Sequence, residues 1–377
     1  MARVRLLTFI VLTALLVVTL PLAGAELLLR ALGRPVPLVS GWRAPVNEQL
    51  RMQRNELGYR GQPIEYGEDD TVVLLVGDSQ VEAMACAYEW MPERRLEAHL
   101  GARSGRRVHV FSLGAGGYGQ DQQLLALREY LARYRADVVI NWETPGNDLW
   151  NITFPTMDPD GLQPKPTFWL ENGELRGPSS QMGEIVSPRM RLVSLIERRW
   201  PLRLPDEEWE TRLPPPYKPM EAYRGPVNRT WQERFDENLG TIPTDNFATE
   251  KSHMAIFLEP RSPRTGYSAT LMHLLLQQMA SAVQSRGGRF MTYWVDVPSV
   301  DLPEPEAVYS LNGRYYRASR RQALRTLAEA NAGFATHVSP LPMAQWRVSP
   351  VDGHLNEHAV DMVMQDLAAA VTPLVAQ

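Results

Sequence analysis

A serine, Ser79, directly follows an apolar run that ends in a Gly77-Asp78 pair. A serine at a turn between a strand and a helix exposes its hydroxyl and presents its own main-chain N–H at the helix N-terminus. Such a hydroxyl becomes a nucleophile when a neighbouring base takes its proton. His354 is the candidate base, and Asp352 is the candidate carboxylate that holds the imidazole in one tautomer. These residue types suit acyl transfer through a serine.

Acyl transfer also requires hydrogen-bond donors for the negative oxygen of the tetrahedral intermediate. The candidate donors are the main-chain N–H of Ser79, the N–H of Gly117 and the side-chain amide of Asn147. Gly117 lies in a glycine-rich stretch, residues 114–119, in which Gly114 is the alternative choice.

Strand and helix patterns alternate around these residues. Apolar runs predict strands over residues 71–76, 107–113, 136–142, 289–298 and 334–338. Helical patterns cover residues 81–100, 119–134, 268–288, 316–333 and 356–374. This alternation predicts an α/β fold with a parallel sheet. Because parallel strands present ligands at their carboxyl ends, we expect Ser79, Gly117, Asn147 and the Asp352/His354 pair to converge on one edge.

The motifs resemble, in order, the four blocks of the SGNH (GDSL-type) hydrolase family. The matching stretches are Gly77-Asp78-Ser79, "SLGAGGYGQDQ" from Ser112, "PGNDLW" from Pro145 and "DGHLN" from Asp352. Two positions depart from the family pattern: Ser112 stands where many members have Asn, and the Asp-to-His spacing is two where many members have three. The resemblance covers about residues 70–150 and 268–371.

The resemblance implies carboxylic-ester chemistry with Ser79 as nucleophile, His354 as base and Asp352 as its orienting partner. It places Ser79, Gly117 and Asn147 in the oxyanion hole. It implies no metal and no organic cofactor. Together with the element pattern, it predicts a three-layer α/β/α sandwich with a flavodoxin-like, five-stranded parallel sheet.

Two other kinds of site could use some of these residues. The stretch from Gly114 to Gly119 matches the Gly-x-Gly-x-x-Gly pattern of dinucleotide sites, with Glu143 near the position of the ribose-binding acid. This pattern follows the second predicted strand, whereas a dinucleotide fold carries it after the first. His358 lies four positions after His354 but without the His-Glu-x-x-His arrangement, so a zinc pair is not expected.

The N-terminus predicts a membrane-directed segment. Arg3 and Arg5 precede an uncharged run from Leu6 to Ala25, which is long enough to cross a hydrocarbon core of roughly 30 Å. We expect residues 1–33 to form an N-terminal transmembrane helix. Ala23-Gly24-Ala25 resembles a signal-peptidase site, so cleavage and secretion is the alternative. Both interpretations place the rest of the chain outside the cytoplasm, in the periplasm or at the cell surface.

The remaining chain divides into three predicted parts. Residues 34–66, rich in Pro and Gly, form a linker or surface arm. Residues 67–377 form the domain with the hydrolase-like motifs. Residues 151–265, rich in Pro, Trp, Tyr and Arg, interrupt that domain as an insert and predict a helix over 189–200. The aromatic residues of the insert suit either sugar stacking or a small core of a lid.

The composition limits which kinds of partner and which kinds of site we expect. The 377-residue chain has a formal charge of −4 and 44% hydrophobic residues, so it can bury a large core and is not basic enough for nucleic acid to be its main partner. The single cysteine, Cys86, excludes an intrachain disulfide and a cysteine metal cluster. We expect an ester hydrolase acting on an acylated glycan, lipid or small molecule of the cell envelope. An O-acyltransferase and a catalytically inactive glycan-binding scaffold are the alternatives, and the oligomeric state stays open.

Overall fold

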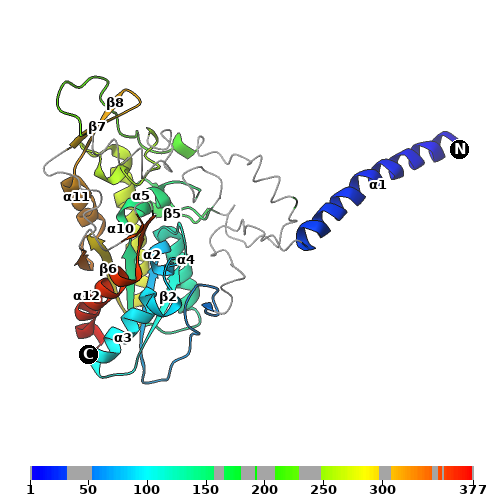
Figure 1. Cartoon of the computed structure of the whole chain (residues 1–377). Coiled ribbons are helices and arrows are strands. Elements are labelled where there is room, and N and C mark those ends of the chain that lie inside the picture. The colour runs from blue at the N-terminus through cyan, green and yellow to red at the C-terminus, as the bar shows by residue number, and fades with distance from the viewer. Residues whose placement is uncertain are drawn as a thin grey trace.

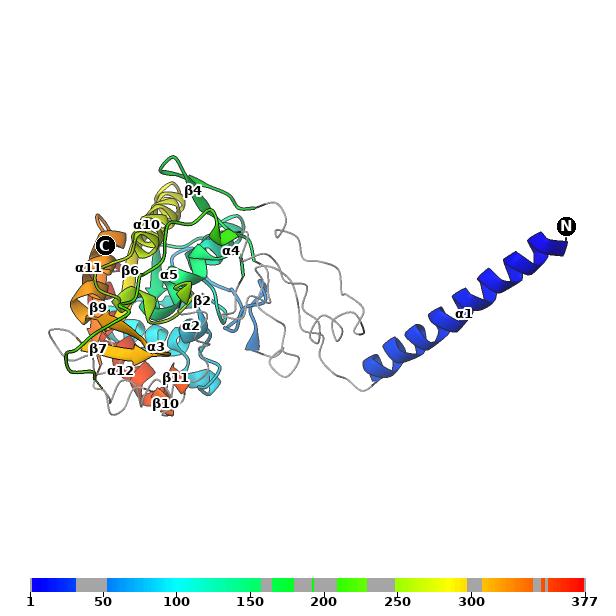
Figure 2. The ribbon, with the colours of Figure 1, turned by 90° about the horizontal axis from the view of Figure 1, so that it is seen from above.

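A computed structural model of the chain describes residues 2–31, 53–156, 165–179, 192, 209–228, 248–296, 307–341, 347–349 and 352–375. Helix α1 (Ala2–Ala31) lies apart from the α/β body in both ribbon views (Figures 1 and 2). Within the part of the chain that the structure describes, no helix is both long and apolar enough to cross a membrane. The predicted transmembrane helix is therefore not supported.

The centre of the fold is a five-stranded parallel sheet with the order β2-β1-β3-β6-β9. Its strands are β1 (Thr71–Gly77), β2 (Val108–Gly114), β3 (Val138–Glu143), β6 (Arg289–Asp296) and β9 (Ala335–Pro340). The order is that of doubly wound flavodoxin-like sheets. The predicted α/β fold with five parallel strands is confirmed.

Helices cover both faces of this sheet. One layer holds α4 (Gln120–Leu131), α5 (Pro145–Thr153), α10 (Pro263–Gln284) and α11 (Arg320–Ala330). The other holds α3 (Pro92–Ser104) and α12 (Glu357–Val375). Figure 2 shows the sheet between these layers. In β1, Val72 and Leu74 pack in the core on the α4 and α10 side of the sheet, and Val73 and Leu75 pack in the core on the α3 and α12 side. Both faces of the strand are therefore buried, which explains why its sequence is a continuous apolar run.

Part of the predicted arm covers the exposed edge of the sheet. The side-chain amide of Gln62 donates to the Val110 carbonyl at 2.7 Å, and the Val110 N–H donates to the Glu97 carboxylate at 2.9 Å. The amide of Asn55 donates to the carbonyl of Ser112 at 3.0 Å. These side chains take the place of a neighbouring strand along β2 and leave fewer of its backbone groups unpaired.

The helix predicted over residues 81–100 is wrong as a single element. Helix α2 (Ser79–Glu82) ends at once, because Ala83 adopts a left-handed conformation with a φ of 48°. A 3₁₀ turn, η2 (Tyr88–Trp90), precedes α3. The cause is Arg60, whose guanidinium binds the carbonyls of Glu82, Ala83 and Cys86, groups that a continuous helix would use itself.

Several short elements complete the described chain. The hairpin β7 (Ala307–Leu311)–β8 (Arg314–Ala318) occupies the start of the helix predicted over residues 316–333, which begins only at Arg320. Within the insert lie β4 (Trp169–Glu171), β5 (Glu174–Arg176) and the 3₁₀ turn η4 (Ala255–Phe257). Strands β10 (Arg347–Ser349) and β11 (Asp352–Leu355) form a hairpin before α12. The helix predicted over 189–200 lies outside the described residues, apart from Leu192, which is helical.

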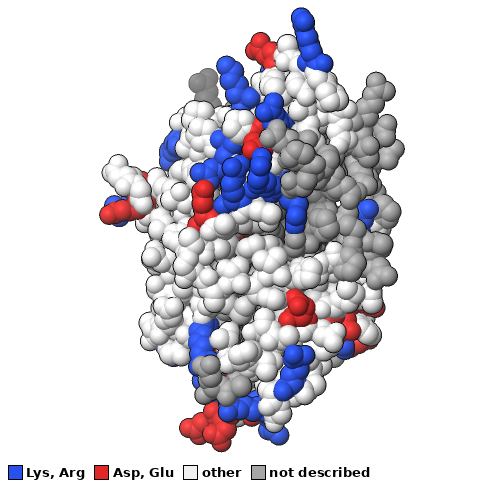
Figure 3. Space-filling model, turned by 90° about the vertical axis from the view of Figure 1, so that its left-hand side faces the viewer, with Lys and Arg blue, Asp and Glu red and all other residues white. Residues whose placement is uncertain are grey.

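Basic side chains gather on the upper part of the face that carries α11 (Figure 3). On this face Arg325 contacts Glu259 at 3.1 Å and Arg261 pairs with Glu329. Arg321 lies 4.0 Å from the same Glu259 carboxylate. Part of the positive charge is therefore neutralised locally, and this face lies on elements other than those that carry the candidate catalytic residues.

Candidate active site

Ser79 is the first residue of α2, and one residue, Asp78, separates it from the end of β1. Gly77 ends the strand where a Cβ would collide with the side chain of Val81. Asp78 then caps the helix, because its carboxylate accepts the N–H of Gln80 at 2.9 Å. Ser79 is half-buried, and among the described residues its hydroxyl has no hydrogen-bond partner. The turn therefore presents a hydroxyl that is free to react.

Asp78 positions the amide of Asn147. The Asn147 side chain donates to the Asp78 carboxylate at 3.0 Å, and the Thr144 hydroxyl donates to the same carboxylate at 3.0 Å. Asp78 is completely buried, and this burial raises its pKa, although the hydrogen bonds from Gln80, Asn147 and Thr144 oppose the shift. Asn147 is thus fixed next to the Ser79 turn with one N–H engaged and the second N–H of its amide left over.

A second buried carboxyl lies behind Asn147. Asp148 accepts the main-chain N–H of Thr144 at 2.7 Å and is fully buried. Burial, and after it the charge of Asp78, raises the pKa of Asp148 well above its usual range. The start of α5 is therefore tied to the Ser79 turn through polar contacts to the buried Asp78 carboxyl.

His354 and Asp352 lie on β11 and face the same side of the strand. The Nδ1 atom of His354 lies 2.6 Å from Oδ1 of Asp352, and the His354 main-chain N–H donates to the same oxygen at 3.0 Å. The main-chain bond, and after it the side chain of His354, lowers the pKa of Asp352. With Nδ1 paired to a carboxylate, the Nε2 atom of the imidazole is left to accept a proton.

Gln80 joins the serine turn to the histidine strand, a role that the sequence analysis missed. Its side-chain amide donates to the Gly353 carbonyl at 3.4 Å and accepts the Leu355 N–H at 3.2 Å. The two contacts flank His354 in the chain. The residue after the serine thus aligns the backbone that carries the candidate base.

The glycines of the loop at residues 114–119 have different surroundings. A Cβ on Gly114 would collide with Val81 and lie 2.6 Å from the Glu82 nitrogen, so this glycine serves close packing. The Gly116 N–H is occupied, since it donates to the Glu82 carboxylate at 2.9 Å. Gly117 has a φ of 75°, and within the described residues its N–H has no hydrogen-bond partner. Within the described residues, Gly117 therefore has a free donor that Gly116 lacks.

The neighbouring loop is held by a buried arginine that the sequence analysis also missed. Arg60 is 3% exposed, and its guanidinium donates to the carbonyls of Glu82 at 3.2 Å and Cys86 at 2.8 Å. Burial raises the pKa of the Cys86 thiol to about 11, so the thiol stays protonated at neutral pH. Cys86 is a packing residue rather than a second nucleophile.

The geometry also bears on the dinucleotide alternative. A Cβ on Gly119 would lie 2.8 Å from the Ile152 side chain, so helix packing alone explains this glycine. Glu143 is buried, accepts the Asn331 amide at 2.9 Å and has a pKa raised to about 8 by burial. A carboxyl enclosed in this way cannot reach a ribose. Among the residues that the structure describes, no group of three His, Cys, Asp or Glu side chains is placed to hold a metal ion.

Comparisons with known proteins give limited information. No family model matches the chain. No curated protein matches it either. Among solved structures, a protein assigned as an arylesterase from Agrobacterium tumefaciens has 15% identity and a TM-score of 0.35, covering 81% of this chain and 99% of that one.

Two further solved structures are similar at the same level. A lipase from a goat rumen metagenome has 11% identity and a TM-score of 0.34, covering 80% of this chain and 97% of that one. A carbohydrate acetylesterase family member from Sinorhizobium meliloti has 14% identity and a TM-score of 0.29, covering 81% and 100%. All three names belong to ester hydrolases. TM-scores this low carry no further argument, so the site itself must support the function.

Proposed function

We propose that the protein is a serine-dependent carboxylic-ester hydrolase. One observation carries the proposal: a free Ser79 hydroxyl and a free Gly117 N–H follow neighbouring strands of the sheet, with Asn147 bound to the Ser79 turn, and Gln80 joins this turn to the strand that carries an imidazole whose Nδ1 is paired to Asp352. A packing motif does not require an imidazole paired to a carboxylate together with an unpartnered hydroxyl. These residues supply the chemical groups that nucleophilic acyl transfer needs, namely a hydroxyl, a base and oxyanion donors.

The reaction follows from the roles of these groups. Ser79 Oγ attacks the acyl carbon while its proton passes to Nε2 of His354, and Asp352 stabilises the imidazolium. The N–H groups of Ser79 and Gly117 and the Asn147 amide hold the oxyanion. The alcohol leaves with the proton from His354. Water then attacks the acyl-enzyme and passes a proton to His354. The bond between the acyl carbon and Ser79 Oγ breaks, His354 returns the proton to Ser79, and the carboxylic acid is released.

An O-acyltransferase would share every step up to the acyl-enzyme and would replace the final water by a bound hydroxyl. The two activities separate when the acid and the acylated acceptor are both quantified after incubation with substrate and a sugar acceptor. The hydrolase proposal predicts free acid as the main product.

We further propose that the catalytic part acts outside the cytoplasm on an acylated glycan or lipid of the envelope. Arg3 and Arg5 before the apolar run from Leu6 to Ala25 support this placement. Fusions of alkaline phosphatase and of green fluorescent protein after residue 66 test it. Phosphatase activity without fluorescence agrees with the proposal, and the reverse pattern contradicts it. Retention in the membrane fraction then distinguishes an anchored from a cleaved segment.

The enzymatic proposal is tested by hydrolysis of p-nitrophenyl acetate. The wild-type protein should release p-nitrophenol, and a Ser79→Ala variant with unchanged circular dichroism should not. Equal turnover by the two proteins would rule out Ser79 as the nucleophile.

A further inference from the structure

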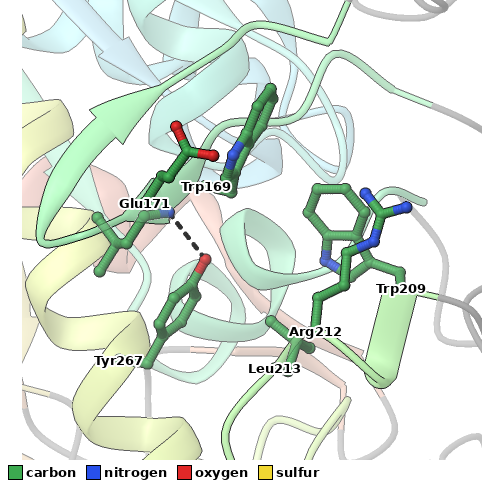
Figure 4. A pocket seen from close by; sticks show the side chains of 7 residues that line it. Trp169, Glu171, Trp209, Arg212, Leu213 and Tyr267 are labelled. Atoms are coloured by element: carbon green, nitrogen blue, oxygen red, sulfur yellow. Dashed lines mark hydrogen bonds between the residues drawn. The ribbon is translucent and has the colours of Figure 1, made fainter.

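The described part of the insert and α10 form a pocket of about 230 Å³, and none of the candidate catalytic residues lines it (Figure 4). The lining side chains belong to the β4–β5 hairpin, a turn at residues 209–213, and α10. They are Trp169, Leu170, Glu171, Trp209, Arg212, Leu213 and Tyr267. Trp169 and Trp209 meet at 88° with ring centroids 6.3 Å apart. The volume suits a single ring rather than a drug-sized molecule.

The pocket differs from a simple lid core in its polar groups. Both indoles are partly exposed, and Glu171 and Arg212 are exposed at its rim. The Arg212 guanidinium lies 5.6 Å from the Trp209 ring centre, and Glu171 pairs with Arg176 at 3.2 Å across the hairpin. The Tyr267 hydroxyl accepts the Leu170 N–H at 3.0 Å, which leaves its own proton available for a ligand. Indole faces beside a carboxylate, a guanidinium and a hydroxyl match the apolar C–H face and polar rim of a sugar ring.

Helix α5 connects this pocket to the catalytic residues. The Trp209 indole N–H donates at 2.9 Å to the carbonyl of Thr153, the last residue of α5. Asn147 lies in the first turn of the same helix and binds Asp78. Thr153 lies six residues after Asn147, which is about 9 Å along the helix axis, roughly the length of two linked sugar rings. Figure 2 shows α5 between the β4 side of the molecule and α2 with β11.

We propose that this pocket, the Trp169/Trp209 pocket, is a non-catalytic subsite for one pyranose ring of a β-1,4-linked hexose chain. Pyranoses whose substituents are equatorial present a flat face of axial C–H groups, which is the surface that an indole can cover. The inference deepens the proposed function in one respect, because it assigns a glycan as the alcohol part of the ester. A chain held here by one ring would bring a more distant acylated ring to Ser79.

The test is isothermal titration calorimetry with cellohexaose and chitohexaose on Ser79→Ala protein, which cannot turn over an ester. We expect one of these oligosaccharides to bind, Trp169→Ala to weaken that binding about tenfold or more, and Trp169→Phe to retain most of it. Glu171→Ala, a change at an exposed hairpin position, should weaken binding without affecting folding.

Trp90→Ala is the matched control, because Trp90 also carries an arginine over its ring, with the Arg95 guanidinium at 4.6 Å. This variant should bind as the parent does. Failure of both oligosaccharides to bind would overturn the proposal, as would equal affinities of the parent, Trp169→Ala and Glu171→Ala proteins. Because binding is measured without catalysis, such a result leaves Ser79 esterase activity to be judged by its own assay.

Discussion

A single carboxylate oxygen of Asp352 faces both the imidazole Nδ1 and the main-chain N–H of His354, at 2.6 and 3.0 Å. A spacing of two residues on one strand permits this double contact, because alternate side chains point to the same face. The short spacing therefore does not separate the carboxylate from the imidazole. Both side chains are about two-fifths exposed, with values of 39% and 40%, so solvent screens their interaction.

This geometry predicts a moderate role for Asp352. Asp352→Asn should lower kcat by about 10²-fold, less than the roughly 10⁴-fold loss seen when a fully buried partner is changed, because water partly replaces the carboxylate. The measurement is kcat and KM on p-nitrophenyl acetate. Asp366→Asn is the control, since Asp366 contacts His337 at 2.7 Å on a different strand. A loss in the control as large as that in Asp352→Asn would show that the effect is not specific to His354.

Gln80 should act on the rate through His354. Removing its amide in Gln80→Ala frees the backbone on both sides of the imidazole, and we expect kcat to fall about tenfold with KM nearly unchanged, as for a loss confined to the transition state. Gln80→Glu keeps the acceptor for the Leu355 N–H and should retain an intermediate rate. Gln278→Ala removes a comparable surface amide contact and should change nothing. A Gln80→Ala enzyme with wild-type kcat would refute the positioning role.

Asn147 should contribute to the oxyanion hole. Asn147→Ala is expected to lower kcat by about 10²–10³-fold, the range for one oxyanion donor, with little change in KM. An effect on KM alone would instead assign Asn147 to ground-state binding. Asn151→Ala on the same helix, where Asn151 is also buried, controls for general damage to α5.

The buried carboxyl of Glu93 should make the stability of the protein depend on pH. Burial raises its folded-state pKa from 4.5 to about 8, so the folded protein binds more protons than the unfolded chain between these values. Stability should therefore fall as the pH rises through this window. The wild-type protein should lose unfolding free energy on the order of 3 kcal/mol by pH 8. Glu93→Gln mimics the protonated form, so this variant should not show that loss.

Urea unfolding at pH 5 and pH 8 measures this effect. Glu129→Gln, which changes a surface pair with Arg133, should keep the wild-type slope. A Glu93→Gln protein with the same pH dependence as wild type would contradict the assignment.

The sheet could be predicted from the sequence because its strands are continuous apolar runs that only a doubly covered parallel sheet requires. The hairpins could also have been predicted. Asn172-Gly173 and Asn312-Gly313 both adopt positive φ angles, and Asn-Gly between two strand-like runs is a strong hairpin signal that the sequence analysis did not use.

The contacts that shape the site depend on tertiary structure. Nothing near Ala83 signals a helix end, because the guanidinium that ends α2 comes from Arg60 in the arm. Gly117 could be distinguished from Gly116 only once Glu82 was seen to occupy the Gly116 N–H. Gln80 and Leu355 are separated by 275 residues in the chain, so no local pattern could pair them.

The most direct test of the central claim is covalent labelling of the wild-type protein by a fluorophosphonate, followed by peptide mass spectrometry. The account predicts a single modified residue, Ser79, and a labelling rate that falls sharply in a folded His354→Ala variant, because the serine needs its base. Labelling at another serine, or labelling of Ser79 at the same rate without His354, would contradict the assignment of a serine nucleophile activated by this histidine.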